Sequence, residues 1–129
     1  MASMPSEMAY VTRAIRGATT LEVDTPEQVT ERIHALLARM MELNSLQGDD
    51  LVSIIFTATG DITSMFPAAA ARSMGLGDVP LMCARELDVK DSMPMCLRVL
   101  MHVNTEAPRS AIHHVYLERA RALRDDLPE

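Results

Sequence analysis

The chain has 129 residues, of which 48% are hydrophobic and 23% are charged, and its formal net charge is −6. These values indicate one globular domain and exclude an intrinsically disordered chain. The negative charge, with no run of Lys or Arg to offset it, argues against nucleic acid as a partner, because a phosphate backbone would be repelled. So small a domain often needs a second subunit to build a deep pocket.

The sequence carries no signal for export, membrane insertion or a disulfide framework. Its N-terminus lacks the apolar segment of a signal peptide, and no run of about 18 apolar residues occurs. The two cysteines, Cys83 and Cys96, belong to no CxxC or zinc-binding motif. We therefore expect a cytoplasmic protein with free thiols and no membrane partner. Residues 1–9 are expected to form a flexible extension ahead of a single domain that spans residues 10–127.

The first predicted elements are a strand and an amphipathic helix. The segment "AYVTRAIRGATT" alternates and is partly β-branched, which indicates a strand that closes at Gly17. Thr25 then serves as N-cap, Pro26 takes the first helical position, and Gln28 completes a capping box. The apolar residues that follow have helical spacing: Val29, Ile33, Leu36, Leu37, Met40 and Leu43.

The middle of the chain is expected to hold a buried strand, a short helix and a further strand. The continuous apolar run "LVSIIFTAT" is typical of a buried strand and stops at Gly60. Pro67 begins a short alanine-rich helix that carries Arg72 and ends at Gly75. The segment after Pro80 predicts another strand.

The segment "CLRVLMHVNT" alternates cleanly, with Leu97, Val99, Met101 and Val103 on one face. Arg98 lies on the other face, where an arginine is out of place unless that face meets a pocket or solvent. The tail is ambiguous, because Pro108 can open a short helix and "LERARALR" has helical propensity, whereas "HHVYL" favours a strand. The order of elements predicts an α/β or α+β domain around a mixed sheet.

The segment "LMCARELDV" places Cys83, Arg85 and Glu86 close together, as a metal site, a nucleophile, a redox thiol or the rim of a polar pocket would. No base is near Cys83 in the sequence, so a buried or pocket-lining thiol is favoured over a nucleophile. His113 and His114 diverge in direction and lack a carboxylate at ligand spacing, which argues against a metal site.

Several arginines lie on elements that otherwise read as buried or half-buried. These are Arg16, Arg72 and Arg98, with Glu86 and Tyr116 as candidate hydrogen-bonding partners. Each arginine alone is more typical of a surface charge or a structural ion pair. Together, on different elements, they would form a receptor for a small dianion.

Five segments, in order and spacing, resemble a known family: "IRGATTLEVDT", "TATGDITSMFPAAAAR", "VPLMCARELDV", "CLRVLMHVNT" and "HHVYLERARALRDDL". From about Tyr10 to Leu127 the chain resembles the monofunctional chorismate mutases of the bacterial trimeric pseudo-α/β-barrel class. The resemblance implies an α+β fold with a mixed sheet and flanking helices. It also implies a homotrimer with active sites between subunits, and the conversion of chorismate to prephenate without a cofactor or metal.

The resemblance also implies a role for each polar residue. Arg98 would face the ether oxygen of the substrate, Arg16 would bind a carboxylate, and Glu86 would accept a hydrogen bond from the ring hydroxyl. Tyr116 would add a hydrogen bond near the carboxylate end. Further substrate-binding residues would come from the floor (Met82, Cys83, Ala84, Arg85), from the adjoining subunit (Phe66, Arg72) and from the covering C-terminal segment (Leu123).

The chain departs from the family pattern at two positions that matter for a site. Ala69 stands where the family often has Lys, and Gly60 stands where it usually has Pro. An alternative function is that of a trimeric imine deaminase-like or small carboxylate-binding protein of related fold. Glu86 together with Arg98 distinguishes the two readings, because a non-enzymatic trimer would not need both to face one cleft. A purely structural interaction domain would leave the polar residues unexplained.

Overall fold

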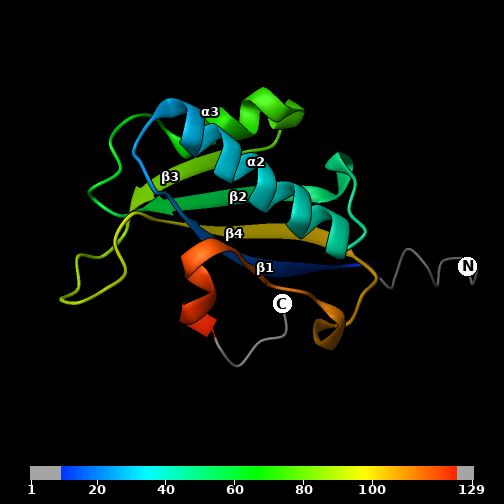
Figure 1. Cartoon of the computed structure of the whole chain (residues 1–129). Helices are drawn as coiled ribbons and strands as arrows, with labels where there is room; N and C mark the ends of the chain where they lie inside the picture. Colours follow the sequence, from blue (N-terminus) through cyan, green and yellow to red (C-terminus); the bar gives the residue numbers. More distant parts are fainter. Residues whose placement is uncertain (1–9, 125–129) are drawn as a thin grey trace, which may run out of the picture.

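Five strands form one mixed sheet in the order β3-β2-β4-β1-β5 in the computed structural model, which describes residues 10–124 (Figure 1). The strands are β1 (Val11–Thr20), β2 (Leu51–Ala58), β3 (Leu81–Arg85), β4 (Cys96–Thr105) and β5 (Val115–Tyr116). The central strand β4 runs antiparallel to β1 and β2, whereas β3 is parallel to β2 and β5 is parallel to β1. The predicted mixed sheet with flanking helices is confirmed.

Both α-helices, α2 (Pro26–Leu43) and α3 (Pro67–Ala71), lie on the same face of the sheet (Figure 1). The predicted apolar stripe of α2 is buried against the sheet at every position except Leu43, which is half-buried. Short helical turns occupy the ranges Gly48–Asp50, Arg72–Leu76, Arg109–Ala111 and Glu118–Arg124. The core is therefore the layer between this helix pair and one side of the sheet.

The start of α2 is capped by Thr25, as predicted, but Gln28 does not complete a capping box. The Thr25 hydroxyl accepts the N–H of Gln28 at 3.1 Å, while the N–H of Thr25 itself donates to the carbonyl of Val23. The side-chain oxygen of Gln28 accepts the N–H of Val23 at 2.9 Å and also that of Glu22. The Gln28 side chain thus bonds to the loop before the helix and not to the backbone N–H of the cap residue.

The prediction that the first strand closes at Gly17 is wrong, because β1 continues to Thr20. A Cβ added at Gly17 would lie 2.5 Å from Sδ of Met40 and 3.2 Å from Cδ1 of Leu36. The glycine therefore lets α2 approach the strand closely, which is a known use of glycine inside a strand. Here glycine marks a close contact and not the end of an element.

The later predictions hold with few changes. The short helix begins at Pro67 but ends at Ala71, so Arg72 follows it instead of lying within it. Gly75, with a φ of 96°, interrupts the turn Arg72–Leu76, and β3 follows Pro80. The ambiguous tail contains both structures, since "HHVYL" contributes the two-residue strand β5 and "LERARALR" forms a 3₁₀ helix. No helix of the described residues is long and apolar enough to cross a membrane. The N-terminal extension lies outside the described residues, so the domain boundaries stay predictions.

One face of the sheet is covered by the α-helices and the other is not. On β2 the prediction of a buried strand holds for one face only: Ile54 and Phe56 are fully buried, whereas Ile55 and Thr57 are half-buried. The physical reason is that α2 and α3 cover one side, and residues alternate between sides along a strand. We call the side opposite the helices the open face.

Gly17→Val is expected to lower the free energy of unfolding by about 1–3 kcal/mol, because the added carbons meet Met40 and Leu36 in a filled core. The matched control is Gly48→Val, since no atom lies within 4 Å of a Cβ at Gly48. Urea unfolding of both variants measures the difference. Equal stabilities would show that the strand and helix do not meet closely at Gly17.

Candidate functional site

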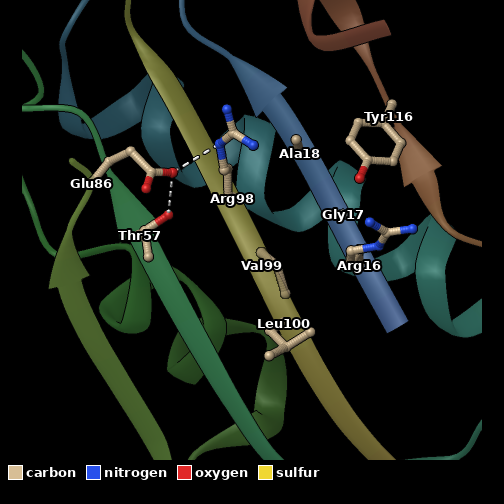
Figure 2. Close-up of a pocket in the computed structure, with 9 residues that line it drawn as sticks. All are labelled: Arg16, Gly17, Ala18, Thr57, Glu86, Arg98, Val99, Leu100 and Tyr116. Carbon is tan, nitrogen blue, oxygen red and sulfur yellow. Dashed lines mark hydrogen bonds and ion pairs between the residues drawn. The ribbon is translucent and has the colours of Figure 1, made fainter. Parts of the chain in front are cut away.

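A pocket of about 310 Å³ opens on the open face of the sheet (Figure 2). Its lining comes from four strands and from the residue that follows β3: Arg16, Gly17, Ala18, Thr57, Glu86, Arg98, Val99, Leu100 and Tyr116. The structure therefore brings together four of the residues that the sequence singled out, from positions 100 residues apart. These are Arg16, Glu86, Arg98 and Tyr116.

Strand register places these side chains on the same face. Arg98 on β4 lies opposite Thr57 on β2 and opposite Ala18 on β1, and Arg16 lies opposite Leu100. Residues directly opposite each other in an antiparallel pair project to the same side of the sheet. The predicted alternation along β4 thus aims Arg98 into the pocket.

Glu86 and Arg98 form an ion pair within the pocket. Nε of Arg98 donates to Oε2 of Glu86 at 2.8 Å, and the Thr57 hydroxyl donates to the same oxygen at 3.2 Å. Figure 2 shows both contacts, with the terminal amino groups of Arg98 directed away from Glu86. The Arg98 side chain is 44% exposed and that of Glu86 is 26% exposed. The pair is therefore accessible to a ligand.

Arg16 and Tyr116 lie at the β1–β5 side of the pocket (Figure 2). The parallel pairing of β5 with β1 places Tyr116 opposite Ala18, so Arg16 and Tyr116 belong to neighbouring strands. Just before β5, Nδ1 of His114 accepts the backbone N–H of Arg16 at 2.9 Å. This hydrogen bond ties the segment that carries Tyr116 to the strand that carries Arg16.

His114 must be neutral at Nδ1 to accept this hydrogen bond. Burial lowers the pKa of His114 below its ordinary value of 6.5, and the positive charge of Arg16 lowers it further. The preceding residue is held separately, because the Asn44 side chain accepts the N–H of His113 at 2.8 Å and donates to its carbonyl at 2.9 Å. The end of α2 therefore helps to position β5.

Other residues predicted for the site line a second pocket of about 680 Å³. Phe66, Cys83, Ala84 and Arg85 line it together with Gly60 and Ala69. Register explains why Cys83 is separated from Arg98: it lies opposite Phe56, which faces the helices. Met82 lies opposite Ile55 on the open face and is 63% exposed. A single chain thus divides most of the predicted residues between two pockets.

Two more predicted residues lie elsewhere. Arg72 is exposed after α3, and Leu123 lines a third pocket that shares Arg98 with the first. In one chain Leu123 therefore shares a pocket with Arg98, whereas Arg72 lines neither of the pockets that contain Arg98.

Gly60 makes room for Arg85. A Cβ added at Gly60 would lie 2.5 Å from Nη2 of Arg85, so the guanidinium rests directly over the glycine. Arg85 forms no ion pair with any described residue. Because this chain has Gly60 where the family usually has Pro, the Arg85 guanidinium can lie at the wall of the pocket that Ala69 also lines.

The thiols and other metal-ligating groups show no catalytic cluster. Both cysteines are free, and burial raises the pKa of the Cys96 thiol, which disfavours a thiolate. Cys83 is half-buried. Within residues 10–124, no group of three or more His, Cys, Asp or Glu side chains could hold a metal ion.

Sequence reasoning missed the residues that complete the wall, chiefly Thr57. Its only sequence signal is a hydroxyl near the end of an otherwise apolar run. The functional meaning comes from the register that places it opposite Arg98, and this pairing depends on the fold. Ala18, Val99 and Leu100 were missed because small and apolar residues in strands carry no chemical signature.

Two arginines, a carboxylate and a phenol around one pocket have the chemistry to hold a small anion with a hydroxyl or other donor group. The family model for chorismate mutase type I matches residues 12–127. The chain belongs to the type I chorismate mutase family, and its enzyme class is that of an isomerase.

Individual relatives agree with this assignment. The chain is 48% identical to the chorismate mutase AroH of Thermus thermophilus, over 89% of this chain and 95% of that protein. It is 42% identical to AroH of Bacillus subtilis, over 89% and 91% of the two chains. A solved chorismate mutase structure from Clostridium thermocellum matches with a TM-score of 0.84 and 47% identity, covering 85% of this chain and 98% of that one.

Stability is expected to fall at mildly acidic pH because of His114. Its pKa is lowered in the folded protein, so the unfolded chain takes up the proton first as the pH falls. The His114 contribution is therefore complete above about pH 6.5 and decreases below it until the lowered folded pKa is reached. Urea unfolding between pH 8 and pH 5 measures this loss.

His114→Asn should remove that part of the pH dependence, since its side-chain oxygen can accept the Arg16 N–H without titrating. His113→Gln is the matched control, because the His113 side chain is exposed beside it. An unchanged pH profile in His114→Asn would contradict the assignment.

Proposed function

We propose that the open-face pocket binds chorismate and accelerates its rearrangement to prephenate, a step toward phenylalanine and tyrosine. The observation that carries the proposal is the Glu86–Arg98 pair, which faces one pocket together with Arg16. A non-enzymatic carboxylate-binding protein would need the arginines but not this carboxylate. Family membership supports the same substrate.

The reaction explains why no nucleophile is required. In one six-membered transition state the ether C–O bond breaks while a new C–C bond forms, and no proton is transferred. The enzyme must hold the flexible enolpyruvyl arm over the ring, which removes an entropic barrier. It must also stabilise the negative charge that develops on the ether oxygen.

Arg98 is the residue proposed to meet that charge. Its Nε donates to Glu86 at 2.8 Å, which leaves the terminal amino groups directed away from the carboxylate (Figure 2). A donor held in place before the reaction stabilises the transition state without reorganisation. Arg16 would bind a carboxylate of the substrate, and Tyr116 would donate a hydrogen bond beside it. Glu86 would accept the ring hydroxyl.

We propose that the site is completed in a cytoplasmic homotrimer formed by the single domain. Support comes from apolar side chains that the single chain leaves uncovered, among them Phe66 at 70% exposure and Met82 at 63%. Arg72 and Phe66 lie outside the Arg98 pocket, and a neighbouring subunit would bring its own copies to the opposite wall. Leu123 would cover the site from the C-terminal segment.

Arg85 is proposed to replace the cation that Ala69 lacks. Both residues line the second pocket, and Gly60 allows the Arg85 guanidinium to lie there. A cation at the mouth of a site raises the local concentration of a dianionic substrate. The departures at Gly60 and Ala69 would therefore compensate each other.

Arg98→Ala is expected to lower kcat by roughly 100-fold or more, because it removes a contact made mainly in the transition state. The assay follows the loss of chorismate absorbance in the ultraviolet and identifies prephenate as the product. Cys83→Ser is the control and should keep substantial activity, since no covalent step is required. Near-normal turnover by Arg98→Ala would refute the role, and failure of the wild type to consume chorismate would refute the function.

If each active site is shared between two subunits, mixed trimers of the impaired variants Arg98→Ala and Arg72→Ala are expected to regain activity. Random mixing in a trimer should restore about one quarter of the sites, because each site then takes Arg98 from one subunit and Arg72 from the next. Co-expression with two affinity tags yields the mixed species for kinetic assay. Sedimentation should give about three times the chain mass of 14.2 kDa. No recovery in mixed trimers would show that the two residues serve separate sites.

A further inference from the structure

Thr57 is the one hydroxyl-bearing side chain in the lining of the Arg98 pocket besides that of Tyr116. We propose that Thr57 is a positioning residue whose hydroxyl holds the Glu86 carboxylate, and through it the Arg98 guanidinium, in the orientation that the reaction requires. This inference rests on the proposed function.

The contacts around Glu86 form a small network. Oε2 accepts from Nε of Arg98 at 2.8 Å and from the Thr57 hydroxyl at 3.2 Å. Oε1 accepts the backbone N–H of Leu87 at 3.3 Å. Three donors, from β2, from β4 and from the residue after Glu86, therefore hold one carboxylate. Thr57 is the only one of the three that is neither charged nor adjacent to Glu86 in sequence.

The ion pair alone would hold its geometry poorly. Both partners have long side chains with several rotatable bonds, and both are partly exposed, so solvent weakens their attraction. The Glu86 backbone is anchored, because its N–H donates to the carbonyl of Ala58 at 2.9 Å, but this leaves the side chain free to rotate. A further fixed donor is needed to select one rotamer.

Thr57 is well suited to supply that donor. It lies near the end of β2, directly opposite Arg98 in the antiparallel pairing with β4. A β-branched side chain in a strand has restricted χ1 freedom, so its hydroxyl is aimed with little loss of entropy. Half-buried Ile55 and Leu100 flank the pair on the same face, which limits competing water. Figure 2 shows the hydroxyl below the carboxylate and the guanidinium beside it.

This network gives the nitrogens of Arg98 different roles. With Nε bound to the carboxylate, Arg98 meets a ligand through its terminal amino groups alone. Rotation of Glu86 would turn the guanidinium plane and displace those groups from the ether oxygen. Loss of the Thr57 hydroxyl should therefore reduce kcat more than it raises KM, since the displaced contact matters most in the transition state.

The test compares Thr57→Val, which keeps the shape and removes the hydroxyl, with Thr57→Ser, which keeps the hydroxyl. Thr57→Val is expected to lower kcat roughly tenfold with a smaller change in KM, and Thr57→Ser should restore most of the rate. Both variants should unfold at temperatures close to that of the wild type. An active wild type with an equally active Thr57→Val would overturn the proposal and leave the proposed function intact.

The same substitution in a Glu86→Ala background separates positioning from direct contact. If Thr57 acts through Glu86, Thr57→Val adds no further loss to Glu86→Ala. A loss of equal size in both backgrounds would show that the hydroxyl acts on the substrate or on the fold instead, and would overturn the proposal.

A measurement without substrate keeps the inference independent of the activity. The Nε–H resonance of Arg98 in ¹⁵N-labelled protein reports the hydrogen bond to Glu86. Thr57→Val should shift this resonance and speed its exchange with water, and Thr57→Ser should preserve it. An unchanged resonance in Thr57→Val would overturn the positioning role, whether or not the protein converts chorismate.

Discussion

The ion pair between Arg98 and Glu86 depends on a sheet that carries α-helices on only one side. With α2 and α3 packed on the other side, the open face can hold charged groups close to a hydrophobic core without burying them completely. Full burial would impose a large desolvation cost on both charges. Full exposure would weaken their attraction and leave both side chains free to move. The half-covered sheet provides the intermediate environment that an anion receptor needs.

The sequence was a good guide to elements whose local signals agree with their tertiary surroundings. The helix begins at its predicted cap, and the alternation of β4 placed Arg98 opposite the buried residues. The predictions are wrong where a residue makes a contact that its local sequence pattern does not indicate. Gly17 wrongly predicts a strand end, because its actual partner, Met40, lies on a helix that is distant in sequence. Gln28 has the spacing of a capping box but bonds to the loop before it.

The candidate site was predictable for its charged members and not for its geometry. Charged residues within apolar segments are conspicuous, so Arg16, Glu86 and Arg98 could be singled out before any pairing was known. Thr57 could not, because its role follows from register alone. Nor could the sequence show that Cys83 faces away from Arg98, since one position along β3 decides the face.

The pairing of β1 with β4 and β5 also constrains how the protein is made. Arg16 and Tyr116 become neighbours only after almost the whole described chain is available, because β5 is the last strand to leave the ribosome. Contacts so distant in sequence slow folding relative to a helical bundle of the same size. An incomplete nascent chain would therefore expose its strands without offering a receptor. The proposed site would therefore form only after β5 has joined β1.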